Sequence, residues 1–222
     1  MALRWGTTSR AEGSFAVPPV APPSGVPPSD HDGRWAALTG APTTWLRQHH
    51  GTSVVRVREP GGGCGAAADA AVTDVPGAAL AVVTADCAPV VLMGRRSVGV
   101  AHAGWRGLLD GVVERTVDAL AELGEDPTLI IAHVAPCIGP GHYEFGPAEL
   151  DLVAGRYGDD VRARTATGRP ALDLRAGVVA ALAGRGVTAV SVDGRCTAAD
   201  PGLYSWRARR DLGRQATWVV IG

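Results

Sequence analysis

The chain of 222 residues contains no lysine and no asparagine, so all 21 of its basic residues are arginines. Without lysine, neither a Schiff-base mechanism nor a lysine-bearing phosphate loop is available, and without asparagine there is no N-glycosylation site. An anionic group on a ligand must therefore be met by arginine, histidine, backbone N–H groups or a metal ion.

Net charge and long apolar runs are also scarce. The formal net charge is −1, which gives no electrostatic basis for a nucleic-acid partner or an anionic membrane surface. No stretch approaches the roughly 18 apolar residues of a membrane span, and the first residues lack an apolar signal segment. We therefore expect a cytoplasmic protein, a monomer or small homo-oligomer, with reduced cysteines at positions 64, 87, 137 and 196.

Hydrophobic residues make up 46% of the chain, enough for a sizeable core. Strand-like and helix-like patterns alternate along it without an internal repeat or a clear domain break. Strands are predicted at 3–8, 52–59, 77–94 (two segments), 97–104, 128–136, 187–194 and 214–222. Helices are predicted at 107–124, 147–158 and 172–186. The pattern predicts one mixed α/β or α+β domain over residues 1–222.

Three segments place metal-binding residue types beside predicted strands. Cys87 follows an apolar strand, His102 ends the next one, and His49 and His50 precede the strand at 52–59. A catalytic zinc site uses three such protein ligands and leaves a fourth position open. Taken alone, however, Cys87 equally fits a small buried residue and His102 a hydrogen-bonded core histidine, so spacing does not decide between these interpretations.

Five segments carry more specific motifs. They are LRQHHGTSVV, DAAVTDVPGAALAVVTADCAPVVL, VGVAHAGWRGLLDGVVERTV, APCIGPGHYEFG and CTAADPGLYSWRARRDLGRQA. Together, from about residue 45 to the C-terminus, they resemble the YfiH family, also called the laccase-domain or multicopper polyphenol oxidase family. The combination of TADCxPV with AHAGWRG is highly specific.

The resemblance implies a single domain of mixed β-sheets packed by helices. It also implies a zinc enzyme whose partners are purine nucleosides and phosphate. The implied reactions are phosphorolysis of adenosine, inosine, guanosine and methylthioadenosine, and deamination of adenosine. The implied zinc ligands are His50, Cys87 and His102, with His49 at the variable position before the first ligand.

Two residues beside the implied ligands are candidates for catalysis. Asp86 is predicted to move protons in deamination, although a turn aspartate that caps backbone N–H groups fits equally well. Arg106 presents a planar fork for phosphate, with a surface salt bridge as the alternative. A helix that opens at Gly107 would also point the N–H groups of 107–110 at an anion.

Four further residues are predicted to contact the substrate. Trp105 would stack on the base or pack in the core, and Cys137 and His142 would line the pocket or only shape a glycine-rich turn. Arg10 resembles part of the family's first motif. Residues 16–30, which hold six of the sixteen prolines, stand where the family has a substrate-side loop. We expect this proline-rich arm to be mobile without ligand and to contribute to nucleoside specificity, with a solvated loop that has no function as the alternative.

Three other functions remain open at this point. The His₂Cys set also suits copper, as in a laccase-like polyphenol oxidase, but six histidines are too few for a true multicopper oxidase. Alternatively, Cys87 is the nucleophile and His102 the base of a cysteine hydrolase that edits peptidoglycan peptides. A metal-stabilised binding module without catalysis would need a fourth ligand, and only three are well placed.

Overall fold

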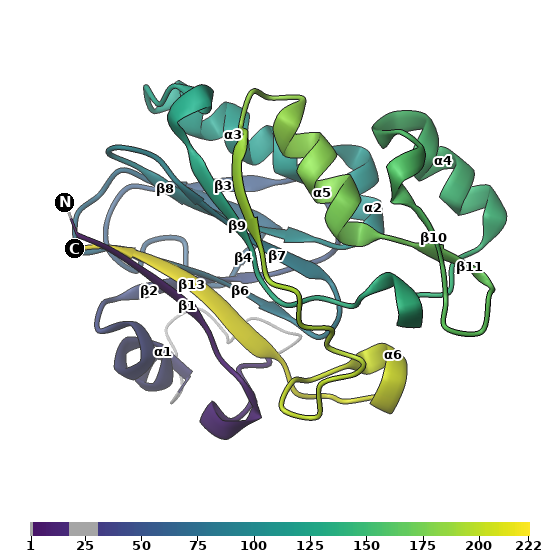
Figure 1. Ribbon diagram of the computed structural model, residues 1–222. Helices are drawn as coiled ribbons and strands as arrows, with labels where there is room; N and C mark the ends of the chain where they lie inside the picture. Colours follow the sequence, from purple (N-terminus) through teal and green to yellow (C-terminus); the bar gives the residue numbers. More distant parts are fainter. Residues whose placement is uncertain (1, 18–30) are drawn as a thin grey trace.

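The computed structural model describes residues 2–17 and 31–222 (Figure 1). Except for Ala16 and Val17, the predicted proline-rich arm lies outside the described residues. The expectation that it is mobile therefore stays a prediction.

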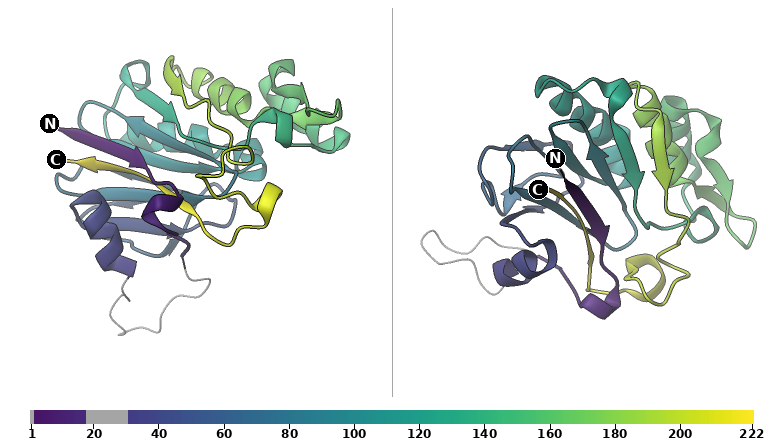
Figure 2. Two further views of the ribbon diagram at one scale, coloured as in Figure 1. Left: turned by 60° about the horizontal axis from the view of Figure 1, so that its bottom comes forward. Right: turned by 60° about the vertical axis from the view of Figure 1, so that its left-hand side comes forward.

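Two mixed β-sheets lie face to face at the centre of the molecule (Figures 1 and 2). The five-stranded sheet has the order β1 (Leu3–Thr7), β13 (Gln215–Ile221), β6 (Ala79–Thr84), β2 (Thr43–Arg47) and β4 (Ala66–Ala67). The six-stranded sheet has the order β12 (Ala189–Val192), β9 (Ile131–Val134), β7 (Ala88–Met93), β8 (Val98–Ala103), β5 (Ala70–Thr73) and β3 (Val54–Val57). Apolar side chains from both sheets, among them Leu80, Val91 and Val100, fill the space between them.

Helices cover the outer faces of both sheets. Four lie on the side of the six-stranded sheet: α2 (Trp105–Asp110), α3 (Val112–Glu122), α4 (Pro147–Tyr157) and α5 (Leu174–Ala183). On the opposite side, α1 (His31–Thr39) packs Trp35 against the five-stranded sheet. This layered arrangement confirms the predicted mixed α/β fold class. β6 and β8 are buried at every position because both of their faces are covered, which explains why their sequences are apolar over most of their length rather than alternating.

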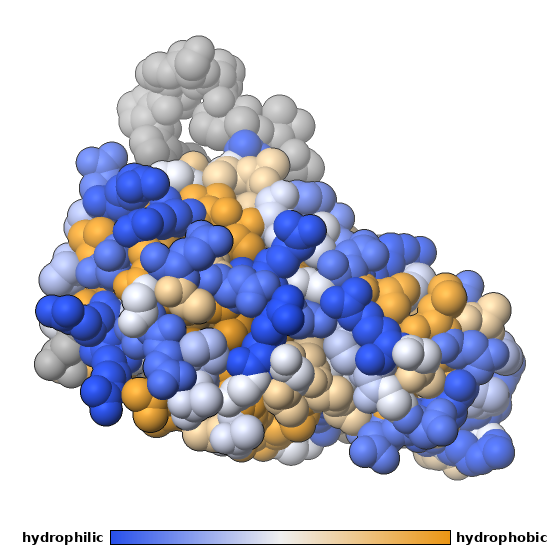
Figure 3. Space-filling view, turned by 90° about the horizontal axis from the view of Figure 1, so that it is seen from above, coloured by the Kyte–Doolittle hydropathy of each residue, from blue (hydrophilic) through white to orange (hydrophobic). Residues whose placement is uncertain are grey.

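The remaining elements are short. They are the hairpin of β10 (Arg162–Arg164) and β11 (Pro170–Leu172), the helix α6 (Trp206–Arg209), and the 3₁₀ turns Arg10–Glu12, Pro127–Leu129, Pro140–His142 and Asp159–Val161. No helix among the described residues is both long enough and apolar enough to cross a membrane. The face above the helical layer is mainly hydrophilic, with scattered hydrophobic patches (Figure 3).

The helix predicted at 107–124 is two helices. Gly111 separates α2 from α3 and has φ 96°, a left-handed conformation that favours glycine. The backbone N–H of Leu108 donates to the carbonyl of Gly104 at 2.8 Å, because α2 already begins at Trp105. The expectation that the N–H groups of 107–110 are available to an anion is therefore wrong for Leu108.

Candidate metal centre

Three donor side chains converge from different parts of the fold. His50 lies in the loop after β2, Cys87 in the turn between β6 and β7, and His102 in β8. One donor atom from each lies within 4.8 Å of the other two. Cys87 Sγ is 3.7 Å from His50 Nε2, and the rings of His50 and His102 meet edge to face with centroids 4.8 Å apart. The structure thus brings the three predicted ligands together.

The backbone at this point is unusual. The turn that carries Cys87 crosses from one sheet to the other, and Asp86 has φ 100°. In regular extended backbone, consecutive side chains point to opposite faces. The left-handed turn breaks this alternation, so both Asp86 and Cys87 line the same pocket. His50 also has a positive φ, 63°, in a tight turn just before Gly51.

Gly104 sits against the donors. A Cβ at this position would lie 2.5 Å from Cδ2 of His50 and 3.2 Å from Sγ of Cys87. Any other residue would therefore have to displace one of these side chains. The close approach gives a packing reason for the glycine that follows the strand of His102.

Asp69, which the sequence analysis did not single out, holds two of the three donors in place. Its fully buried carboxylate contacts His102 Nδ1 at 2.8 Å and accepts hydrogen bonds from the backbone N–H groups of His50 at 2.9 Å and Gly51 at 2.8 Å. Because Nδ1 of His102 is engaged by the carboxylate, Nε2 is left for the site. The signal in the sequence is a single acidic residue within the apolar segment 66–72.

The neighbours of Cys87 make its sulfur a strong donor. Burial opposes ionisation of the thiol, but the charge and hydrogen bonds of His102 and then His50 outweigh it and lower the pKa of Cys87 to about 6. Burial also opposes the charge on His102, yet the Cys87 thiolate and Asp69 raise the pKa of His102 to about 9. A thiolate is the form that binds metals, and a metal ion would compete with the proton on His102. One thiolate and two imidazoles are a donor set that fits zinc.

The donors open into a pocket of about 740 Å³. Its lining comprises Ala16, Val17, Gln48, His50, Val83, Thr84, Ala85, Asp86, Cys87, His102, Tyr143, Trp206, Arg207, Leu212 and Arg214. Of the predicted site residues, the pocket contains the three donors and Asp86. The pattern of the sequence did not point to Trp206, Arg207 or Arg214, which come from the C-terminal segment.

Asp86 joins the pocket wall to that C-terminal segment. One carboxylate oxygen accepts a hydrogen bond from the hydroxyl of Thr197 at 2.6 Å, and the other accepts from the backbone N–H of Arg207 at 2.6 Å. Asp86 therefore caps backbone, as one of its two interpretations predicts. Each oxygen keeps a second lone pair that neither of these two hydrogen bonds uses.

Arg106 and Trp105 lie beside the centre but do not line the pocket. The Arg106 guanidinium is 4.3 Å above the Trp105 ring, and that ring meets Phe145 edge to face with centroids 5.3 Å apart. Trp105 also packs against the helical core. The two roles predicted for these residues, a phosphate contact and a base stack, stay predictions.

Cys137 and His142 are not among the residues that line the pocket. Cys137 is fully buried, and the Arg175 side chain donates to its sulfur at 3.4 Å. Burial raises the pKa of Cys137 to about 11. His142 is exposed, with Nδ1 3.6 Å from the sulfur of Cys196. These contacts join the turn to Arg175 and Cys196, while the N–H of the neighbouring Ile138 donates to the carbonyl of Asp86 at 2.9 Å.

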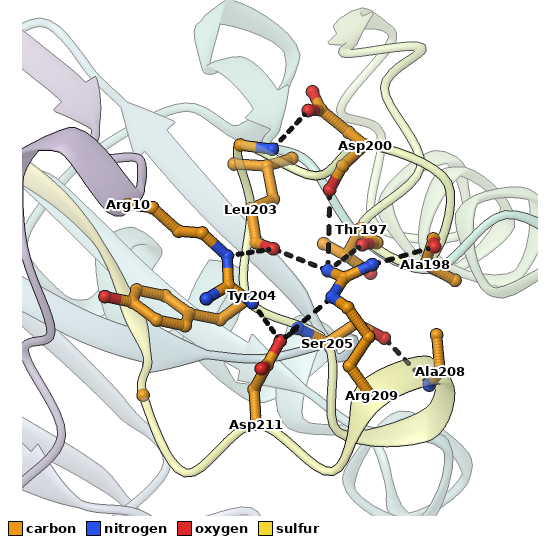
Figure 4. A network of polar contacts seen from close by, with 12 residues as sticks. Arg10, Thr197, Ala198, Asp200, Leu203, Tyr204, Ser205, Ala208, Arg209 and Asp211 are labelled. Atoms are coloured by element: carbon orange, nitrogen blue, oxygen red, sulfur yellow. Dashed lines mark hydrogen bonds and ion pairs between the residues drawn. The ribbon is translucent and has the colours of Figure 1, made fainter.

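Arg10 also acts on the C-terminal segment (Figure 4). Its Nε donates to the carbonyl of Leu203 at 3.1 Å, its guanidinium forms an ion pair with Asp211, and it lies 4.5 Å above the Tyr204 ring. Arg209 adds hydrogen bonds to several carbonyls of the same loop. This network fixes the loop that carries four of the pocket residues, so Arg10 reaches the pocket only through it.

Comparisons with known proteins show close sequence and fold similarity. The family model described as multi-copper polyphenol oxidoreductase laccase matches residues 32–222. A Mycobacterium tuberculosis protein named purine nucleoside phosphorylase is 40% identical over 192 residues, covering 84% of this chain and 76% of that protein.

Solved structures agree with the fold. The hypothetical protein YfiH of Bacillus licheniformis has a TM-score of 0.83 at 23% identity, covering 99% of this chain and 93% of its own. A Neisseria meningitidis protein has a TM-score of 0.77 at 31% identity, covering 86% of this chain and 79% of its own. These likenesses confirm the mixed α/β architecture.

Proposed function

Because the chain belongs to the YfiH, or laccase-domain, family, we propose that it is a zinc-dependent purine nucleoside phosphorylase that also deaminates adenosine. The substrates are adenosine, inosine, guanosine and methylthioadenosine, together with phosphate. The observation that carries the proposal is the cluster of His50, Cys87 and His102, which opens into a pocket of about 740 Å³. Ligand pockets for small molecules commonly have about this volume, roughly 300–1,000 Å³.

The three donors would hold the zinc ion. When bound, zinc supplies a Lewis acid that stabilises developing negative charge. Asp69 keeps the imidazole of His102 in one tautomer and orientation, since its carboxylate engages Nδ1. The same carboxylate fixes the turn of His50 through backbone N–H groups, so the donor set is organised before any ligand enters.

In phosphorolysis, an oxygen of phosphate forms a bond to C1′ of the ribose while the bond from C1′ to the purine nitrogen breaks. The electron pair of that bond goes to the purine, which takes up the proton that phosphate carried. The products are ribose 1-phosphate and the free base. The enzyme must therefore hold phosphate, ribose and base together, which a pocket lined by both apolar and cationic side chains can do.

In deamination, water adds to C6 of adenine and ammonia leaves, so protons must move from the water to the departing nitrogen. Asp86 is the carboxylate that lines the pocket, and we assign it this proton transfer. Its bonds to Thr197 and the Arg207 backbone orient the carboxylate.

One set of contacts favours a second candidate function. Cys87, His102 and Asp69 are arranged as nucleophile, base and orienting carboxylate, with a thiolate favoured at neutral pH. This geometry suits a cysteine hydrolase acting on peptidoglycan peptides. Metal distinguishes the two candidates, because a thiolate bound to zinc is not available as a nucleophile. Copper held by the same donors would instead indicate phenol oxidation.

The test measures the metal content of the purified protein and its products from adenosine and inosine, with and without phosphate. We expect about one zinc per chain, phosphate-dependent formation of ribose 1-phosphate from both nucleosides, and phosphate-independent formation of inosine from adenosine. A metal-free protein that is rapidly alkylated at Cys87 and leaves both nucleosides intact would favour the hydrolase.

A further inference from the structure

The C-terminal segment places two arginines on the wall of the pocket. Arg207 lies in the short helix α6, and Arg214 lies just before β13. Among the described residues that line the pocket, the one carboxylate is Asp86, whose two oxygens already accept hydrogen bonds from the protein. Among the lining residues, positive charge therefore exceeds negative charge in the part of the pocket formed by this segment.

Both guanidinium groups are anchored without being neutralised. Arg207 Nη1 donates to the carbonyl of Glu144 at 3.0 Å, and the group lies 4.9 Å from the centroid of the Tyr143 ring. Arg214 Nη1 donates to the carbonyls of Asp211 at 3.0 Å and Gly213 at 2.8 Å. Within residues 2–17 and 31–222, neither arginine forms an ion pair, in contrast to Arg10 and Arg209, which share Asp211. Backbone carbonyls position the two side chains but leave their charge for a ligand.

The wall also holds a polar atom that lacks a partner. Thr84 is 2% exposed, and its hydroxyl forms no hydrogen bond with any other described residue. Buried hydroxyls are normally hydrogen-bonded, since leaving one unpaired is costly. Thr84 belongs to the lining of the same pocket, two residues before Asp86.

We propose that Arg207 and Arg214 form the subsite that binds inorganic phosphate in this pocket. The inference rests on the proposed phosphorylase function and assigns its second substrate to residues other than Arg106. A chain without lysine must meet phosphate with arginine, and each planar fork offers several N–H donors in the geometry of a phosphate edge. Arg106 stacks on Trp105 and lies outside the pocket lining, whereas Arg207 and Arg214 face the same space as the donor cluster.

The test compares Arg207→Gln and Arg214→Gln with Arg210→Gln in the zinc-loaded protein. Arg210 belongs to the same segment, but it stacks on Trp206 and does not line the pocket, so it is a matched control for lost charge. We expect KM for phosphate in inosine phosphorolysis to rise by about 10- to 100-fold in each of the first two variants, the scale of a lost charged hydrogen bond. In the Arg210→Gln control, KM for phosphate should stay near the wild-type value.

A direct binding readout separates this inference from the proposed function. Inorganic phosphate alone should raise the melting temperature of the wild-type protein and of the control variant, and should do so much less in the two pocket variants. This comparison holds even if the wild-type protein turns out not to cleave nucleosides, which would overturn only the proposed function.

Three results would overturn the subsite. One is an unchanged KM for phosphate in both pocket variants, and another is an equal effect of phosphate on all melting temperatures. The third is a rise in KM that occurs in Arg106→Gln alone. If a glutamine variant fails to fold, Arg207→Lys and Arg214→Lys keep the charge and lose the fork. Those variants should then show an intermediate KM, and a wild-type value would count against the proposal.

Discussion

Among single residues, Asp69 has the largest part in organising the candidate centre, because its carboxylate contacts both His102 and the loop of His50. Asp69 is fully buried, yet both of its oxygens accept hydrogen bonds: one from His102 and the His50 backbone, the other from the Gly51 backbone, while the backbone N–H of His49 lies 3.2 Å from both. Burial opposes its charge, but these donors, with His102 the strongest, keep the pKa of Asp69 below its usual value. The charged carboxylate therefore pre-orients two ligand-bearing segments that lie far apart in the chain.

Replacing Asp69 with asparagine should weaken zinc binding about 10- to 100-fold, the usual effect of losing a partner behind a metal-binding histidine. In asparagine, an NH₂ group replaces one of the two acceptor oxygens, and this donor would face either the backbone N–H groups or His102. Zinc affinity measured by competition with a chelating dye checks this, with Asp74→Asn as control, since Asp74 is an exposed partner of Arg56. Equal affinities in the two variants would show that Asp69 has no part in positioning the donors.

At the scale of elements, the join between β8 and α2 determines how closely the donors approach. Gly104 has ordinary extended backbone, with φ −74° and ψ 163°, so its importance lies in the missing side chain. The space that a Cβ would need is occupied by His50 and Cys87. Helix α2 therefore begins at a residue whose missing side chain leaves room for His50 and Cys87.

Gly104→Ala should therefore lower zinc content and phosphorolysis together, because the methyl group displaces His50 from the cluster. Gly155→Ala is the matched control: nothing lies within 4 Å of the added Cβ in helix α4, and alanine there should stabilise the helix by up to about 1 kcal/mol. Zinc analysis and melting curves of both variants provide the measurement. A Gly104→Ala protein with full zinc content would mean that the loop of His50 moves without cost.

The local sequence pattern predicted those elements in which every residue has the same environment, such as strands that are buried at all positions. The apolar runs of β6 and β8 could be predicted because both of their faces are buried, whereas the set of His50, Cys87 and His102, which the structure brings together, was implied by the family resemblance and not by spacing. The break at Gly111 was not predicted, since a lone glycine is tolerated inside a helix and only its positive φ reveals the turn. Arg207 and Arg214 were missed because the contact between Arg207 and Asp86 spans 121 residues and leaves no local pattern.

At the scale of the whole molecule, the donor cluster joins the two sheets. His50 follows β2 of the five-stranded sheet, His102 belongs to β8 of the six-stranded sheet, and Cys87 lies in the turn between the sheets. A bound ion would thus add to the ties between the layers, which at this end are the apolar contacts and the hydrogen bonds that Asp69 accepts from the loop of His50. Metal binding and the stability of the fold should be linked.

Removal of zinc by a chelator should lower the melting temperature of the wild-type protein. With zinc 100-fold above its Kd, binding contributes about 2.7 kcal/mol, which corresponds to roughly 5–10 °C for a domain of this size. Cys87→Ser should melt at the same temperature with and without zinc, whereas Cys64→Ser, in an exposed loop, should behave as wild type. Scanning calorimetry measures all three, and a zinc-dependent shift that persists in Cys87→Ser would place the ion elsewhere.

The most direct test of the account titrates zinc into metal-free protein while phosphate-dependent release of hypoxanthine from inosine is followed. In wild type the rate should rise from near zero and level off at about one zinc per chain, and in Cys87→Ser it should stay near zero. Full activity of the metal-free protein, or equal activation of the Cys87→Ser variant, would contradict it.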